Sequence, residues 1–75
     1  MRIEIYTKPN CPYCVKAKNL FSQKGLPYEE KNITDDAGFR AELLERVPHA
    51  KTVPQIFFDG RAMGGYDDIK NLDLK

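Results

Sequence analysis

Two cysteines, Cys11 and Cys14, separated by Pro12 and Tyr13, are the residues of this 75-residue chain best suited to chemistry. Disulfide exchange requires a thiolate, but an ordinary cysteine thiol, with a pKa of about 8.5, is mostly protonated at neutral pH. Cys11 occupies a helix N-cap position and Pro12 the first helical position, where a missing N–H costs nothing. The free N–H groups and the positive end of the helix dipole there would stabilise a Cys11 thiolate.

The second cysteine lies one helical turn further on, on the same side of the predicted helix but deeper. We therefore expect Cys14 to be less exposed and less ionised than Cys11. Lys8, three residues before Cys11, adds a cation near the reactive sulfur. The pattern predicts that Cys11 attacks a disulfide and that Cys14 resolves the intermediate.

Two other interpretations of the cysteine pair remain open at this point. The same spacing supplies two of the four ligands of a zinc site, but the chain has no third cysteine and His49 is its only histidine. The pair could also be packing residues only. A structural disulfide is disfavoured, because so short a loop contributes only about 2 kcal/mol.

Composition limits the classes of function. Twelve basic and eleven acidic residues give a net charge of +1, which does not indicate nucleic acid binding. The apolar run Val53–Phe58 is far shorter than the roughly 20 residues of a membrane helix. Met1-Arg2 leads directly into a strand-like segment, leaving no room for an export signal. We expect a soluble protein in a reducing cytoplasm, with residues 1–75 forming a single domain around one core.

The elements that would position the cysteines follow from hydrophobic period and turn residues. A half-buried strand is expected at Arg2–Tyr6, where polar and apolar residues alternate, and a short strand is expected at Tyr28–Ile33. Asp59-Gly60 is a strong hairpin turn signal. It predicts the paired strands Gln55–Phe58 and Arg61–Met63.

Three helices are expected between and after these strands. The first begins at Pro12 and stops at Gly25–Pro27, the second follows Thr34–Asp36 and ends before Pro48, and Asp67-Asp68 opens the third. The order β-α-β-α-β-β-α indicates an α/β fold whose first two strands pair in parallel. The inward faces are predicted to hold Cys14, Ala17, Leu20 and Phe21 in the first helix, Phe39, Leu43, Leu44 and Val47 in the second, and Ile69, Leu72 and Leu74 in the third.

Three separated motifs resemble the dithiol branch of the glutaredoxin family. They are Thr7 to Cys14 (TKPNCPYC), Thr52 to Phe57 (TVPQIF), and Gly64 to Asp68 (GGYDD), and together they span nearly the whole chain. The resemblance implies the thioredoxin fold, a mixed four-stranded sheet flanked by three helices. It also implies a cis peptide bond at Val53–Pro54, facing the cysteines.

The resemblance further implies a glutathione site. The backbone at Thr52 and Val53 would pair with the cysteinyl part of glutathione, and the Gly64–Asp68 segment would hold its γ-glutamyl end. Arg40 and Lys51 are candidates to reach the glycine carboxylate, but neither falls in a matched motif, and both are left outside the site. The glutathione-binding residues carried over are Lys8, Pro12, Tyr13, Thr52, Val53, Pro54, Gly65, Tyr66, Asp67 and Asp68.

The activity implied by the resemblance is reduction of protein disulfides and protein–glutathione mixed disulfides, with glutathione as reductant and neither a metal nor a bound cofactor. Ribonucleotide reductase is a candidate partner, and a monomer is expected. One rival is a small redoxin reduced by thioredoxin reductase, which typically lacks the Pro-Tyr pair and the Asp-Asp segment. Another is a binding module that holds an iron–sulfur cluster through Cys11 and glutathione in a dimer, although such relatives usually carry glycine and serine in this motif.

Overall fold

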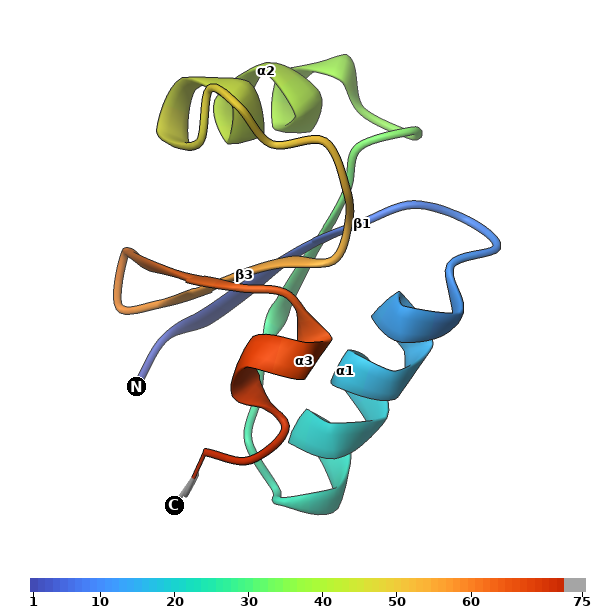
Figure 1. The fold of residues 1–75 in the computed structure, drawn as a ribbon. Helices are drawn as coiled ribbons and strands as arrows, with labels where there is room; N and C mark the ends of the chain where they lie inside the picture. The colour runs from blue at the N-terminus through green and yellow to red at the C-terminus, as the bar shows by residue number, and fades with distance from the viewer. Residues whose placement is uncertain (73–75) are drawn as a thin grey trace.

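The computed structural model describes residues 1–72, which form one mixed sheet with helices on both faces (Figure 1). The strand order is β2-β1-β3-β4, in which β1 pairs in parallel with β2 and antiparallel with β3. The element order and the fold class predicted from the sequence are confirmed. In chain order the elements are β1 (Ile3–Thr7), α1 (Pro12–Gln23), β2 (Glu29–Asn32), α2 (Ala37–Arg46), β3 (Gln55–Phe58), β4 (Arg61–Gly64) and α3 (Tyr66–Ile69).

Turn and cap residues set the ends of these elements as predicted. Asp59 and Gly60 both have positive φ, 51° and 83°, which is the backbone of a tight hairpin turn between β3 and β4. Gly25, with φ 68°, follows the last turn of α1. The side chain of Asp36 caps α2 by accepting a hydrogen bond from the Gly38 N–H at 2.7 Å.

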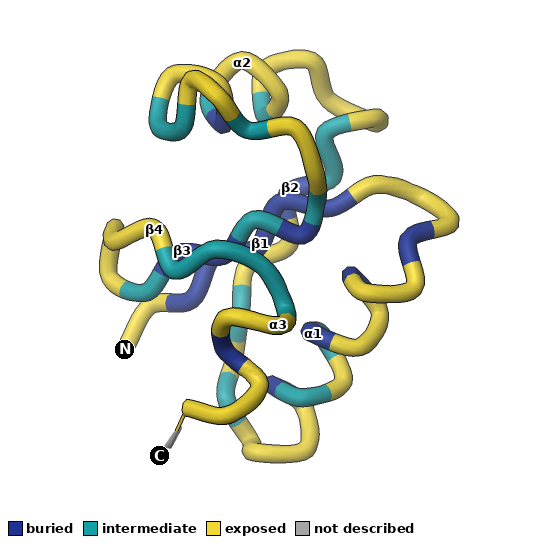
Figure 2. The backbone as a smooth tube through the Cα atoms, viewed as in Figure 1, coloured by how far each residue is buried: buried dark blue, intermediate teal, exposed yellow. Residues whose placement is uncertain are grey.

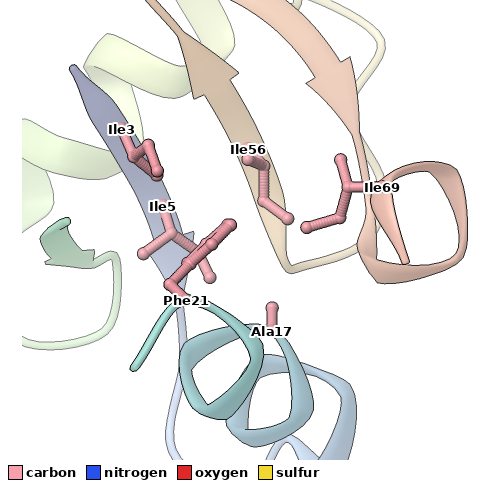
Figure 3. Close-up of a cluster of buried hydrophobic side chains, with 6 residues drawn as sticks. All are labelled: Ile3, Ile5, Ala17, Phe21, Ile56 and Ile69. Atoms are coloured by element: carbon pink, nitrogen blue, oxygen red, sulfur yellow. The ribbon is translucent and has the colours of Figure 1, made fainter. Parts of the chain in front are cut away.

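One face of the sheet is covered by α1 and α3, and an apolar cluster fills the space between them (Figure 3). Ile3 and Ile5 of β1 and Ile56 of β3 point from the sheet toward these helices. Ala17, Phe21 and Ile69 pack against them from the helices. This cluster anchors the helix that begins at the cysteine pair.

The opposite face is covered by α2, and it makes β1 more buried than the sequence indicated (Figure 2). Tyr6, Phe57 and Leu43 form a second apolar cluster there. The alternating pattern predicted a half-buried strand, but all five residues of Ile3–Thr7 are buried. The prediction was wrong because Glu4, read as solvent-facing, lies under α2 in a polar network.

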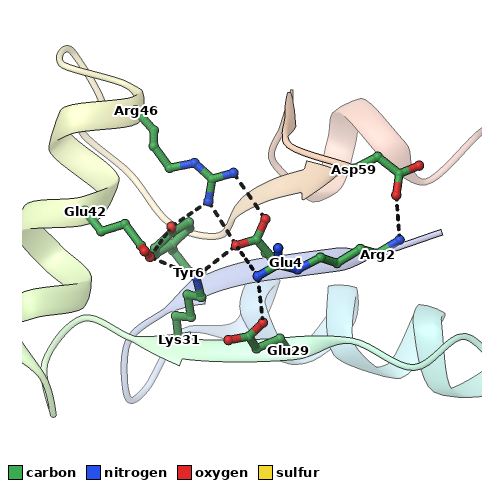
Figure 4. Close-up of polar contacts among 8 residues, drawn as sticks. All are labelled: Arg2, Glu4, Tyr6, Glu29, Lys31, Glu42, Arg46 and Asp59. Atoms are coloured by element: carbon green, nitrogen blue, oxygen red, sulfur yellow. Dashed lines mark hydrogen bonds and ion pairs between the residues drawn. The ribbon is translucent and has the colours of Figure 1, made fainter.

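That network joins two strands to α2 (Figure 4). Lys31 Nζ lies 2.8 Å from Glu4 Oε2 and 2.9 Å from Glu42 Oε2. The Arg46 guanidinium donates to both carboxylate oxygens of Glu4, at 3.0 and 3.1 Å, and to the Tyr6 hydroxyl at 2.8 Å. Among the described residues, no buried side-chain nitrogen or oxygen lacks a hydrogen-bond partner.

Two residues predicted to face inward are exposed. Leu44 is 43% exposed, because α2 buries only a narrow line of its surface, centred on Leu43. Leu72 is 39% exposed, because α3 ends at Ile69 and its helical period does not reach that far. Leu74 lies outside the described residues. No helix within residues 1–72 is both long and apolar enough to cross a membrane.

Candidate active site

Cys11 occupies the N-cap of α1, as its sequence position predicts. Its backbone is extended, with φ −116° and ψ 100°, and its Sγ accepts a hydrogen bond from the Cys14 N–H at 3.2 Å. Pro12 is the first residue of the helix. The sulfur therefore receives a helix N-terminal N–H, an interaction that favours a thiolate.

A second contact connects Cys11 to the segment that precedes β3. The Cys11 thiol donates to the Val53 carbonyl at a sulfur–oxygen distance of 3.6 Å. The peptide bond between Val53 and Pro54 is cis, as the resemblance implied. The segment that leads into β3 thus lies directly beside the reactive sulfur.

The two thiols, both free, differ in their surroundings. Cys11 is 8% exposed and Cys14 is 1% exposed. Burial, together with the neighbouring Cys11 sulfur, raises the pKa of the Cys14 thiol to about 12. The predicted difference in burial, in which Cys14 is the deeper thiol, is confirmed.

A groove of about 430 Å³ lies between the start of α1 and the start of α3. One wall is a pair of aromatic rings, Tyr13 and Tyr66, whose centroids lie 6.2 Å apart. Thr52, Val53 and Pro54 line the same groove. It brings together eight of the ten residues carried over from the resemblance: Tyr13, Thr52, Val53, Pro54, Gly65, Tyr66, Asp67 and Asp68.

Within this groove Asp68 has a structural partner. Its Oδ2 accepts a hydrogen bond from the Gly65 N–H at 2.8 Å, which caps the start of α3. Gly64, with φ 92°, lies so close that a Cβ on it would sit 2.4 Å from Asp68 Oδ2. The close approach and the left-handed backbone both require glycine at this position.

A second groove, of about 240 Å³, lies beside the first and shares Thr52 and Val53 with it. Three cationic side chains line it: Lys8, Arg40 and Lys51. The sequence prediction named Arg40 and Lys51 as candidates for the glycine carboxylate but left both outside the site, because neither falls in a matched motif. A signal was nevertheless available, since both are basic and Lys51 immediately precedes the Thr52-Val53-Pro54 motif.

Lys8 and Pro12, the remaining two predicted residues, lie outside the groove walled by the tyrosines. Both line a third cavity, of about 600 Å³, which also holds Cys11 and Cys14. Lys8 therefore borders both this cavity and the second groove, which is lined by Lys8, Arg40 and Lys51 and is called the basic groove below. Within residues 1–72, no group of three or more histidine, cysteine, aspartate or glutamate side chains could hold a metal ion.

A cysteine pair at a helix N-terminus, faced by a cis-proline and carried on this sheet, defines a thiol–disulfide oxidoreductase with a thioredoxin fold. The structure resembles glutaredoxin 1 from Francisella tularensis with a TM-score of 0.76 and 34% identity, covering 92% of this chain and 87% of that one. It resembles a buckwheat glutaredoxin–glutathione complex with a TM-score of 0.78 and 30% identity, covering 91% of this chain and 64% of that one.

Sequence comparison narrows the class to one family. The Glutaredoxin family model matches residues 3–63. Glutaredoxin 3 from Escherichia coli strain K12 is 47% identical over 73 residues, covering 97% of this chain and 87% of that protein. The chain belongs to the glutaredoxin family and is a glutathione-dependent thiol–disulfide oxidoreductase.

Proposed function

We propose that this protein reduces protein disulfides and protein–glutathione mixed disulfides, with Cys11 as nucleophile and Cys14 as resolving thiol. The observation that carries the assignment is the Cys11 Sγ at the N-cap of α1, where it accepts the Cys14 N–H. The Cys14 thiol is buried and has a raised pKa, which suits a thiol that acts only after the first attack.

Glutathione would occupy the groove walled by Tyr13 and Tyr66. Its cysteinyl backbone would pair with the backbone of Thr52-Val53. Because the Val53 carbonyl lies 3.6 Å from Cys11 Sγ, this pairing would place the glutathione sulfur near Cys11. Its γ-glutamyl end would lie against Gly65–Asp68 and its glycine carboxylate in the adjoining basic groove. The buckwheat relative, solved as a glutaredoxin–glutathione complex, supports glutathione as the ligand.

Reduction of a protein–glutathione mixed disulfide then needs only one cysteine. The Cys11 thiolate attacks the glutathione sulfur, the mixed disulfide breaks, and the reduced protein leaves as a thiol. Glutathione is now joined to Cys11. A second glutathione thiolate attacks that bond and leaves with the first as oxidised glutathione.

Reduction of a protein disulfide needs both cysteines. Cys11 attacks one substrate sulfur and forms an intermolecular disulfide. Cys14 then attacks Cys11, which releases the reduced substrate and leaves an internal Cys11–Cys14 disulfide. Glutathione reduces that disulfide in turn.

The remaining expectations belong to the same proposal. Residues 1–75 are one domain that acts as a monomer in the cytoplasm. Ribonucleotide reductase is one candidate among its disulfide-containing partners.

The test is reduction of a small glutathione mixed disulfide, coupled to glutathione reductase and NADPH. Wild type and Cys14→Ser should turn over, while Cys11→Ser should be inactive. Loss of activity in Cys14→Ser would contradict the assigned roles. Turnover that requires thioredoxin reductase instead of glutathione would favour the rival redoxin.

A further inference from the structure

The cavity of about 600 Å³ that holds both cysteines is separate from the groove walled by the tyrosines, and it carries two charged residues not yet discussed. Lys18 lies on α1, one helical turn beyond Cys14 and therefore on the same face of the helix. Glu30 reaches the cavity from β2.

These two residues are held in place by a short chain of polar contacts. Lys18 Nζ lies 3.0 Å from Glu30 Oε2, and its side chain is only 27% exposed. The Thr7 hydroxyl donates to the same carboxylate oxygen at 2.8 Å. Thr7, which ends β1, is itself 1% exposed, so the chain of contacts is anchored in the sheet.

Electrostatic interactions connect these polar contacts to the Cys14 thiol. The hydrogen bond to Glu30 raises the pKa of Lys18, which keeps the ammonium charged. Burial alone would raise the pKa of Glu30, but the hydrogen bonds from Thr7 and Lys18 outweigh it and lower that pKa. The Lys18 charge opposes, in part, the burial that disfavours the thiolate of Cys14.

We propose that Lys18, held by Glu30 and Thr7, stabilises the Cys14 thiolate as it forms and so sets the rate of the resolving step. Thr7 and Glu30 are positioning residues, which act through Lys18. The inference rests on the proposed function, because it concerns the attack of Cys14 on Cys11. Its consequence is specific to the two-cysteine reaction, since the one-cysteine reaction never ionises Cys14.

The step balances without a further reactant except water. Cys14 gives its proton to water or hydroxide in the cavity, and its thiolate attacks Cys11 Sγ. The Cys11–Cys14 bond forms as the bond from Cys11 to the substrate sulfur breaks. The electron pair leaves on that sulfur, which then takes up a proton, and the enzyme dithiol ends as the oxidised partner.

The other titratable groups near Cys14 have different positions. Lys8, from the loop after β1, lines the cavity beside Cys11 and also faces the basic groove. Its backbone lowers the pKa of Cys14, an effect that side-chain substitution leaves in place. Tyr28 acts on Lys18 rather than on Cys14. Lys18 is thus the cationic side chain expected to act on Cys14.

The experiment separates the two steps of one reaction. Reduced protein is mixed with excess oxidised glutathione in separate reactions between about pH 6 and pH 9. Samples are quenched with acid at timed intervals, and the mass of the protein is measured. Cys11 first gains one glutathione, and the adduct then disappears as the internal disulfide forms. In wild type the rate of disappearance should rise about tenfold per pH unit, because it follows the thiolate fraction of Cys14.

Lys18→Met should slow the disappearance of the adduct about threefold at each pH, because the smaller thiolate fraction of Cys14 is partly offset by the higher nucleophilicity of a thiolate with a raised pKa. Lys18→Arg should restore most of the rate, because it keeps the charge. Lys24→Met is the matched control, since it removes an exposed lysine at the far end of α1 and should match wild type. Glu30→Gln should give a smaller loss of under about twofold, because the lysine keeps its charge but not its position.

Three results would overturn the inference. They are pH profiles of Lys18→Met and Lys24→Met that superimpose, a Lys18→Arg variant as slow as Lys18→Met, or adduct formation slowed as much as adduct disappearance. Failure of the proposed function looks different, because wild type itself would then form neither the adduct nor the internal disulfide.

Discussion

Lys31 Nζ lies 2.8 Å from Glu4 Oε2 across the parallel strands β1 and β2, and both side chains are buried, at 6% and 3% exposure. Arg46 of α2 contacts the same carboxylate at 3.0 Å. Breaking a buried ion pair by removing one partner leaves a buried charge without compensation. These two contacts therefore connect the edge strand β2 and the helix α2 to β1.

We predict that Glu4→Gln lowers the free energy of unfolding by about 3 kcal/mol, because it removes the buried partner of Lys31 and leaves that charge with the partly exposed carboxylate of Glu42. Urea unfolding followed by circular dichroism measures the change. Glu29→Gln is the matched control, since among residues 1–72 Glu29 pairs only with exposed Arg2, and its loss should cost less than about 0.5 kcal/mol. Equal losses in the two variants would contradict the buried-pair argument.

Acid should remove the contribution of the ionised Glu4 side chain to the free energy of unfolding. The hydrogen bond from Arg46, aided by Lys31, lowers the pKa of Glu4 from 4.5 to about 2. Stability from a lowered carboxyl pKa is present above the unfolded value and is lost as pH falls through the folded value. The difference in unfolding free energy between wild type and Glu4→Gln should therefore narrow by up to about 3 kcal/mol between roughly pH 5 and pH 2. A difference that stays constant over this range would rule out Glu4 as the titrating group.

The elements around the cysteines could be predicted from the sequence because local signals determine them. Pro12 at the first helical position, Gly25 after α1 and Asp59-Gly60 in the hairpin each act within a few residues. The cis bond at Val53–Pro54 and the tyrosine-walled groove came from family motifs, not from local physics.

Tertiary placement decided the features that the sequence did not reveal. Glu4 and Lys31 look like solvent-facing positions in strands, and only the packing of α2 over that face makes them buried partners. Leu44 fits a helical apolar stripe, but the stripe is wider than the surface that α2 buries. Arg40 reaches the site through the fold, far in sequence from the motif whose groove it lines.

Gly64→Ala should weaken both the fold and the use of glutathione. An added Cβ would meet Asp68 Oδ2 at 2.4 Å, so the carboxylate must leave the Gly65 N–H. We expect a loss of about 2 kcal/mol in unfolding free energy and a KM for the glutathione mixed disulfide raised several-fold, about fivefold. Gly60→Ala is the matched control, because Gly60 has a similar φ of 83° but no described residue within 4 Å of an added Cβ. It should lose about 1 kcal/mol and keep the wild-type KM. A wild-type KM in Gly64→Ala would show that Asp68 has no part in the groove.

The raised pKa of Cys14 predicts slow alkylation. Because burial holds that pKa at about 12, only a very small fraction of Cys14 is thiolate near neutral pH. In Cys11→Ser, iodoacetamide should modify Cys14 at a rate that rises about tenfold per unit between pH 8 and pH 10. The same labelling of Cys11 in Cys14→Ser should be at least about a hundredfold faster at pH 7. Comparable rates for the two thiols, measured by mass, would contradict the predicted division of roles.

The basic groove predicts a role in glutathione binding for Arg40 and Lys51, the two residues outside the matched motifs. Arg40 and Lys51 line it together with Lys8, beside the Thr52-Val53 backbone proposed to hold glutathione. Removing either charge should raise KM for the glutathione mixed disulfide about threefold and change kcat less, because an exposed ion pair contributes under about 1 kcal/mol to binding. Salt should reduce the effect, since screening acts over about 8 Å at physiological ionic strength. The difference in KM between wild type and Arg40→Ala or Lys51→Ala should therefore shrink as sodium chloride is raised.

Arg61→Ala is the control for net charge, because Arg61 is exposed on β4 and lines neither groove. If the arginine and lysine of the basic groove attract the glycine carboxylate directly, Arg61→Ala should keep the wild-type KM at every salt concentration. If Arg61→Ala raises KM as much as Arg40→Ala, the effect is one of overall charge on the encounter with an anionic substrate. The basic groove would then lose its assignment as the carboxylate site, while the cysteine chemistry, which depends on the N-cap of α1, would be unaffected.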